Sequence, residues 1–122
     1  MQIKKFTVDR RTWLRGEGGE SSKLLRSRDG KMCCLGFLGE ACGLTKAALW
    51  DNGDFTDLSR PLIAEIPQEL VERGDHAGLY SNTEIATQLM NLNDEQGIDD
   101  IERERSLTGI FAQIGLTVEF QN

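Results

Sequence analysis

The sequence predicts an α+β fold, in which one mostly helical domain spans residues 1–122 and surrounds a buried helix rich in cysteine and glycine. Three observations support this prediction. An almost wholly apolar segment, residues 32–43, contains all three cysteines of the chain. Short alternating segments near the two ends predict a small β-ribbon. Amphipathic segments in the second half predict helices that cover it, and 122 residues suit one domain.

The apolar segment at residues 32–43 is predicted to be the structural centre of the domain. Wound as a helix, it places its cysteines and large apolar side chains on a continuous arc of about 200°. Gly36, Gly39 and Gly43 form a second stripe, and Glu40 carries the only charge. A helix that is apolar nearly all round is buried, and glycines allow another backbone to approach closely.

The two terminal segments are predicted to pair with each other. In residues 5–9, Phe6 and Val8 alternate with polar residues, which indicates a strand. Residues 116–120 show the same period, with Leu116, Val118 and Phe120 on one face. Because a two-stranded ribbon is marginally stable alone, we expect helices to cover it.

The remaining elements follow from turn and capping signals. The glycine-rich residues 15–22 predict a mobile loop, and residues 28–30 predict a turn. Thr45 is placed to cap a short helical turn over residues 46–50. Pro67 predicts the start of a helix over residues 67–73. Residues 81–84 form a capping box that predicts a helix ending at residues 93–94, and a last helix is expected over residues 100–114.

The cysteine content and the hydropathy pattern favour a cytoplasmic protein. Three cysteines within ten residues, an odd number, fit reduced thiols better than a disulfide framework. No apolar run approaches the roughly 18 residues of a membrane span, and the first residues lack the plan of a signal peptide. We therefore expect cytoplasmic localisation and no membrane partner.

Charge is divided unevenly along the chain. Residues 1–31 contain nine Lys or Arg against four Asp or Glu, whereas residues 32–122 contain five against sixteen. The net charge of −6 therefore combines a basic N-terminal lobe with an acidic body. The two parts either neutralise each other within the fold or form two distinct faces.

The chain resembles a group of small phage and prophage proteins in several residues spread along its length. These are Trp13, Gly16, the pair Leu24 and Leu25, the core Cys33-Cys34-Leu35-Gly36, and later Leu92-Asn93-Asp94. The likeness covers about two-thirds of the chain, and the four-residue core is its most specific part. Residues 95–100 depart from the aromatic and Ile-Ala-Asp run that often follows in those proteins. The resemblance implies an origin in a mobile element and no particular reaction.

Nucleophilic catalysis by a thiol is one alternative function. Cys33 or Cys34 would lie in the first turn of the buried helix, where a helix N-terminus lowers a thiol pKa. His76 is the only histidine that could act as a base, and nothing in the sequence places it near the cysteines. Small apolar packing is the alternative role for both thiols. No pair of ligands has zinc-site spacing, so we expect no metal and no cofactor.

A weak nucleic-acid-binding module is a second alternative. Trp13 lies among Arg10, Arg11 and Arg15, an aromatic among cations. The sequence pI near 4.8 opposes this, and Trp13 is expected to pack over the terminal ribbon instead. The glycine-rich residues 15–20 lack the ending of a phosphate loop. We therefore expect no specific nucleic-acid binding.

The acidic body supplies the favoured hypothesis, a partner-binding surface. The candidate contact residues fall close together in the sequence: Asp94, Glu95, Asp99, Asp100 and Glu102. Such carboxylates could dock on a basic surface of a host protein, with charge mainly speeding encounter. Together with the resemblance, this predicts a phage-type accessory protein that binds and inhibits a host protein, with defence systems as one class of target. A solvated helix face is the other explanation of the same charges.

Overall fold

The computed structural model describes residues 3–73 and 80–122, and these residues form a mostly helical α+β fold, as the sequence predicts. The strands are β1 (Lys5–Asp9), β2 (Val71–Arg73), β3 (Tyr80–Asn82) and β4 (Thr117–Gln121). The α-helices are α1 (Cys34–Ala41), α2 (Lys46–Leu49), α3 (Arg60–Ile63), α4 (Glu84–Asp94) and α5 (Asp100–Gln113). Two 3-10 turns are η1 (Gly18–Ser21) and η2 (Phe55–Asp57).

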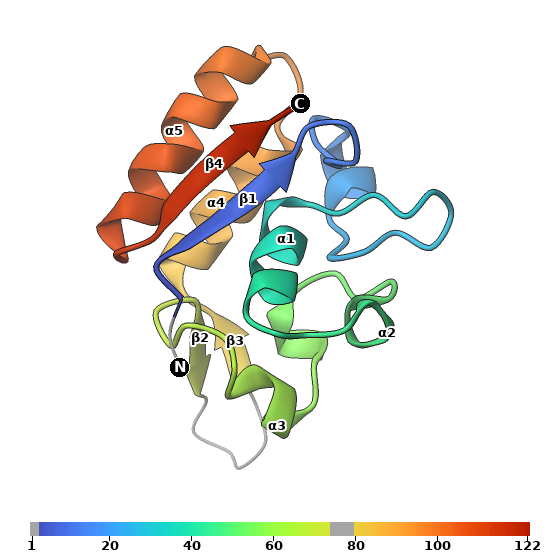
Figure 1. Ribbon diagram of the computed structural model, residues 1–122, viewed down its shortest axis with the longest axis vertical. Coiled ribbons are helices and arrows are strands. Elements are labelled where there is room, and N and C mark those ends of the chain that lie inside the picture. The colour runs from blue at the N-terminus through green and yellow to red at the C-terminus, as the bar shows by residue number, and fades with distance from the viewer. Residues whose placement is uncertain (1–2, 74–79) are drawn as a thin grey trace.

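The terminal strands β1 and β4 pair with each other, which confirms the predicted ribbon, and they run parallel. Phe6 pairs with Val118 and Val8 with Phe120 across the two strands. Figure 1 shows β1 and β4 side by side, with α5 along the outer side of β4. The Phe6 ring meets Phe111 of α5 edge-on at 5.0 Å between centroids. The ribbon therefore depends on helix packing for its stability.

Helix α1 is the buried centre, as predicted, and its glycines have distinct packing roles. Six of its eight residues are buried. A Cβ atom on Gly36 would lie 1.9 Å from the carbonyl oxygen of Leu24, so this position admits only glycine. At Gly39 a Cβ would lie 3.1 Å from a Leu49 methyl carbon. The predicted stripe thus brings residues 24–25 and α2 against the helix, while Gly43 follows α1 at a φ of +99°.

The predicted helix over residues 67–73 is wrong. Leu70 closes only one turn, by donating its N–H to the Pro67 carbonyl, and the chain then enters strand β2. Strand β2 pairs antiparallel with β3, with Val71 opposite Asn82. Residues 71–73 become a strand because they pair with β3, and this tertiary pairing overrides the local preference for a helix after Pro67.

The same pairing moves the start of α4. Residues 80–82 belong to β3, so the predicted capping box at 81–84 does not form, and Thr83 is the N-cap. The Thr83 hydroxyl accepts the Ala86 N–H at 3.2 Å. Helix α4 ends at Asp94, as expected. Helix α5 begins after Asp99, whose carboxylate accepts the Glu102 N–H at 2.8 Å.

The glycine-rich residues 15–22, predicted as a mobile loop, include a short helical turn. They contain the turn η1, and the Ser21 hydroxyl is buried and accepts the Glu17 N–H. Trp13 is buried as well, with its ring 5.0 Å from the Phe120 ring, so the prediction that it packs over the ribbon is confirmed. No helix among residues 3–73 and 80–122 is long and apolar enough to span a membrane.

Candidate functional site

A buried asparagine, Asn93, joins the two halves of the chain. Its side-chain oxygen accepts the Trp13 indole N–H at 2.9 Å and the Cys34 backbone N–H at 3.1 Å. Its amide nitrogen donates to the Leu14 carbonyl at 3.0 Å. Asn93 is only 1% exposed, so these bonds replace water for every group involved.

The residues that carry the phage resemblance lie around this asparagine. Gly16 donates its backbone N–H to the Asn93 carbonyl at 2.9 Å. Cys33, at the N-cap of α1, donates its own N–H to the Lys23 carbonyl, next to Leu24. Trp13, Gly16 and Cys34 thus form a cluster of hydrogen bonds around Asn93. From the sequence, Asn93 and Asp94 are predicted only as the end of a helix, and the contacts of this cluster are not predicted, although their place in the resemblance was a signal.

A buried arginine closes the end of α4. The Arg103 side chain is 3% exposed, and its Nη1 donates to the carbonyl oxygens of Leu92, Asn93 and Glu95. Its Nε lies 3.6 Å from the Asp100 carboxylate, the one ion-pair contact this guanidinium makes within the described residues. The last turn of a helix leaves its carbonyls without intrahelical partners, and Arg103 supplies donors to them, at Asn93 together with the Gly16 N–H. Although Arg103 lies among the candidate acidic residues in the sequence, its side chain is buried and leaves the acidic surface uninterrupted.

The candidate thiols lie where the sequence placed them, around the start of α1, but in an environment that opposes a thiolate. Cys33 and Cys34 are both buried and form no disulfide. Burial raises the pKa of Cys33 to about 12 and that of Cys34 well above its usual range. The expected lowering by the helix N-terminus is outweighed by loss of hydration. The candidate base His76 lies outside the described residues.

The candidate acidic residues divide into structural and free carboxylates. Asp99 caps α5, and Asp100 forms a two-bond ion pair with Arg15 that lowers the pKa of its carboxyl. Glu95 and Glu102 are exposed, and no ion pair reaches either side chain within residues 3–73 and 80–122. The proposed surface therefore retains two carboxylates that the fold does not use.

Asp94 shares features of both the structural and the free carboxylates. Its carboxylate accepts hydrogen bonds from the Ser22 hydroxyl and, at 3.1 Å, from the Asn93 amide. It is partly buried, and burial raises the pKa of its carboxyl even though both hydrogen bonds act in the opposite direction. Asp94 is thus a fixed carboxylate whose charge is only partly hydrated.

A surface hollow of about 720 Å³ opens at Asp94; we call it the Asp94 hollow. Its lining combines two carboxylates, three side-chain amides, two glycines and two apolar side chains. These are, in the same order, Asp94 and Glu95; Gln88, Asn91 and Gln96; Gly18 and Gly19; and Leu92 and Ile110. No Lys or Arg side chain lines it among the described residues. A hollow with carboxylates, amide oxygens and an apolar wall suits a cationic group on an aliphatic stem.

The basic N-terminal lobe is largely neutralised within the fold. Arg10 forms a two-bond pair with Glu104 and Arg15 with Asp100, both on α5. Lys5 pairs with Glu119 of β4 at 2.8 Å. Arg26, with a side chain 8% exposed, pairs with Asp29 and holds the pKa of that carboxyl at about 2. Of the two arrangements left open by the sequence, intramolecular neutralisation describes these cations.

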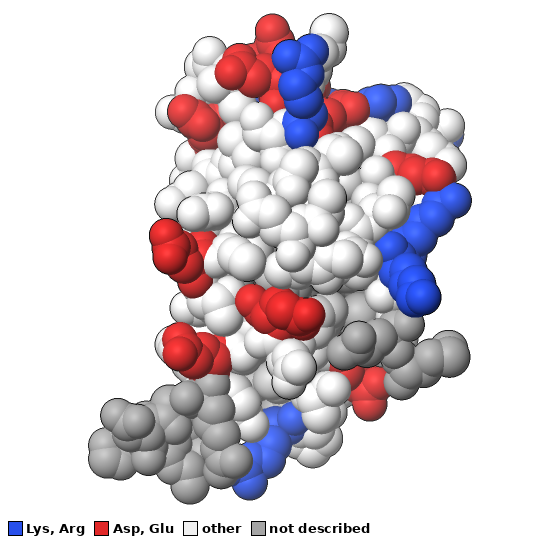
Figure 2. Space-filling view, turned by 90° about the vertical axis from the view of Figure 1, so that its left-hand side faces the viewer, with Lys and Arg blue, Asp and Glu red and all other residues white. Residues whose placement is uncertain are grey.

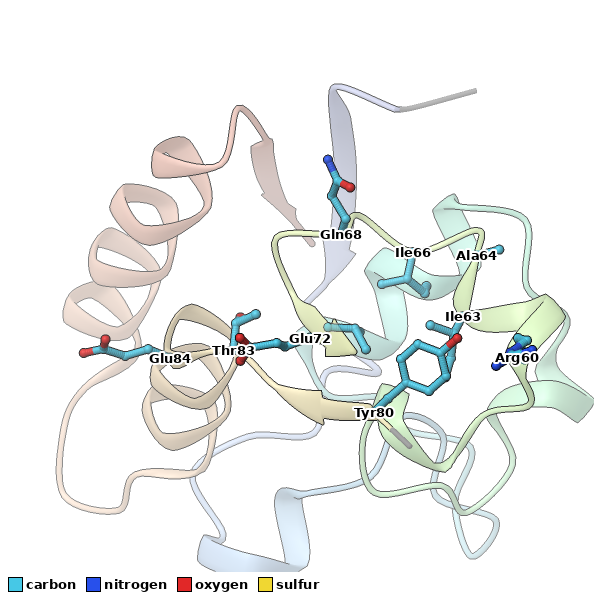
Figure 3. Close-up of a pocket in the computed structure, with 10 residues that line it drawn as sticks. Arg60, Ile63, Ala64, Ile66, Gln68, Glu72, Tyr80, Thr83 and Glu84 are labelled. Carbon is cyan, nitrogen blue, oxygen red and sulfur yellow. The ribbon is translucent and has the colours of Figure 1, made fainter. Parts of the chain in front are cut away.

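A larger hollow, of about 820 Å³, lies between α3 and the β2–β3 hairpin. Figure 3 shows Tyr80 beside Ile63 within it, whereas Gln68 and Glu84 point away from it. The apolar part of its lining includes Ile63, Ile66 and Val71. Because its polar side chains do not converge on one point, it lacks the arrangement that fixes the orientation of a ligand.

Comparison with protein-family models, curated proteins and solved structures finds no match. Within the described residues, no group of three His, Cys, Asp or Glu side chains could hold a metal ion. The chemistry of the Asp94 hollow and of the free surface charges therefore carries the functional argument.

Proposed function

We propose that this protein is a phage- or prophage-type accessory protein that binds and inhibits a host protein through the Asp94 hollow. The partner presents a basic surface, and one of its Arg or Lys side chains enters the hollow. Glu95 and Glu102 add negative charge beside it. The observation that carries this proposal is the Asp94 hollow itself, a concave site with two carboxylates and no cation of its own within the described residues.

The distribution of charge supports a basic partner. Most cations of the N-terminal lobe are held in ion pairs, whereas Glu95 and Glu102 remain exposed on neighbouring helix ends. Figure 2 shows, on the face that lies on the left of Figure 1, acidic side chains around a wide uncharged area, with Lys and Arg side chains toward the edges of the view. Such a surface attracts a basic partner over about a Debye length and repels an acidic one.

The thiol-dependent enzyme is the weaker candidate. Both cysteines of the core are buried with raised pKa values, so neither thiol is activated as a nucleophile. Their backbone groups are engaged in packing α1 against Lys23 and Asn93. A role in the core explains these contacts without a reaction.

A defined peptide tests the hollow directly. We expect a short peptide of alternating glycine and arginine to bind more tightly than the same peptide with glutamine in place of arginine, as measured by calorimetry. Glu95→Lys should weaken binding of the arginine peptide several-fold, and added salt should weaken it further. Glu69→Lys is the matched control, because Glu69 is an exposed carboxylate away from the hollow.

Acidity should weaken the same interaction. The raised pKa of Asp94 means that its charge is lost at a higher pH than for an ordinary aspartate, as the pH falls. Affinity for the arginine peptide should therefore decline on acidification before exposed carboxylates titrate, and Asp94→Asn should flatten that part of the profile. The asparagine oxygen can accept the Asn93 amide N–H, and its amide nitrogen can donate to the Ser22 hydroxyl oxygen.

The host partner can then be sought by capturing proteins from host-cell lysate with the tagged protein. Binding of the purified partner should weaken with salt and with Glu95→Lys, but not with Glu69→Lys. If the affinity for the partner changes neither with salt nor with either substitution, the contact lies elsewhere and the proposal is contradicted.

A further inference from the structure

Trp50 is the feature of this molecule that its packing does not explain. Its side chain is 54% exposed, and Ile101 is the one other large hydrophobic side chain exposed among residues 3–73 and 80–122. The other tryptophan, Trp13, is 2% exposed. Exposed single apolar residues are common, but a half-exposed indole offers a large apolar face that a binding partner can contact.

The backbone around Trp50 is held firmly by residues 24–27. Trp50 forms a bridge with Leu25, and the Asp51 N–H donates to the Leu25 carbonyl at 2.7 Å. Leu24 donates to the Asn52 carbonyl at 2.7 Å. The Ser27 N–H donates to the Asp51 carboxylate at 2.9 Å. The turn that follows Ser27 is therefore fixed beside Trp50.

Three cations gather on these segments. The Lys23 ammonium lies 3.2 Å from the Asp51 carbonyl. Lys46 is the first residue of α2 and is exposed, and Trp50 is the C-cap residue four positions later, a spacing that favours side chains on the same side of a helical turn. Arg28 follows Ser27 in the adjoining turn and is exposed. We call Trp50, Lys23, Arg28 and Lys46 the Trp50 surface.

These cations differ from the others of the N-terminal lobe. Lys5, Arg10, Arg15 and Arg26 are among those in ion pairs, whereas no ion pair involves the three cations of the Trp50 surface within the part of the chain that the structure describes. Asp51 is the carboxylate held against this surface, and three cations beside it leave a positive surplus. The surface therefore favours an anionic partner although the whole chain is acidic.

We propose that the Trp50 surface binds single-stranded nucleic acid, with a base stacked on the Trp50 indole and phosphates held by Lys23, Arg28 and Lys46. An accessible aromatic face beside free cations is the arrangement that single strands use, because unpaired bases offer their own faces for stacking. In a duplex those faces are already stacked, so a duplex would gain only the contacts to phosphate. This site is separate from the Asp94 hollow and does not depend on the proposed function.

The natural fluorescence of the protein gives the first test. A 12-nucleotide oligothymidylate should quench tryptophan emission to saturation, because the exposed Trp50 is the indole it can reach and Trp13 is buried. Binding should weaken with salt, with a logarithmic slope of roughly −2 for three phosphate contacts on a single strand. A duplex of equal length should bind more weakly.

Substitutions then test the residues, with a fluorescent oligonucleotide and anisotropy as the readout. Trp50→Ala should weaken binding roughly 5- to 150-fold, the range expected for loss of one base stack. Arg28→Glu and Lys46→Glu should each weaken it several-fold. Arg105→Glu is the matched control, since Arg105 is an exposed cation on α5. Urea unfolding confirms that each variant is folded.

Two outcomes would overturn the proposal. The first is an unchanged affinity of the folded Trp50→Ala variant for the oligonucleotide, measured by anisotropy, because stacking on Trp50 would then contribute nothing. The second is a polyglutamate peptide that binds as tightly as the oligothymidylate and depends equally on Trp50. That result would identify the Trp50 surface as a docking site for an acidic protein.

Discussion

Asn93 shows how one side chain can hold together distant parts of the chain. Its amide satisfies the indole of Trp13, the first N–H of α1 and the Leu14 carbonyl, all of them buried. No periodicity or spacing predicts such a role, because the partners lie 59 to 80 residues away in the sequence. Sequence reasoning located the residues of this cluster through a resemblance but assigned them no contacts.

Asn93→Ala should therefore cost about 3 kcal/mol or more of unfolding free energy, since it leaves two buried donors and one acceptor without partners. Urea denaturation measures the loss. The control is Asn91→Ala, an exposed position on the same helix, where the change should stay within about 0.5 kcal/mol. Equal, small losses at both positions would mean that water replaces the Asn93 amide.

Among the elements, sequence reasoning succeeded where the signal is local and failed where a distant segment decides. The apolar segment predicted α1, and the helix expected over residues 100–114 corresponds to α5, Asp100–Gln113. The β2–β3 hairpin was missed because Val71–Arg73 becomes a strand only through its pairing with Tyr80–Asn82. That pairing also displaced the predicted cap of α4 from Ser81 to Thr83.

Two helical glycines should respond to alanine in opposite ways. Gly36→Ala should destabilise the protein by roughly 3 kcal/mol or more, because its Cβ would meet the Leu24 carbonyl oxygen at 1.9 Å. Gly109→Ala, on α5, meets no atom within 4 Å and should stabilise by about 0.5–1 kcal/mol through helix propensity. Thermal unfolding of both variants tests the pair, and a tolerated Gly36→Ala would contradict the close approach.

At the scale of the whole molecule, the acidic C-terminal region neutralises the basic N-terminal one. Arg10 and Arg15 reach α5, and Lys5 reaches β4, so the charge asymmetry of the sequence becomes a set of contacts within one fold. The charges left over are the ones available for function. Two groups of them carry the proposals, the carboxylates near the Asp94 hollow and the cations of the Trp50 surface, whereas others, such as Glu69 and Arg105, are exposed elsewhere.

The parallel pairing of β1 with β4 makes the fold depend on residues near both ends of the chain. Deleting residues 116–122 removes five paired positions and the buried side chains of Leu116 and Val118, which cover the same core as Phe6 and Val8. We expect the cooperative urea transition to be lost, because the remaining strand has neither a partner nor a covered face. Deleting Asn122 alone should leave it unchanged, since this residue is exposed and outside β4. A peptide of residues 115–122 added to the shortened chain should restore the transition in proportion to its concentration. A shortened chain that unfolds cooperatively without the peptide would show that the helices alone hold the core.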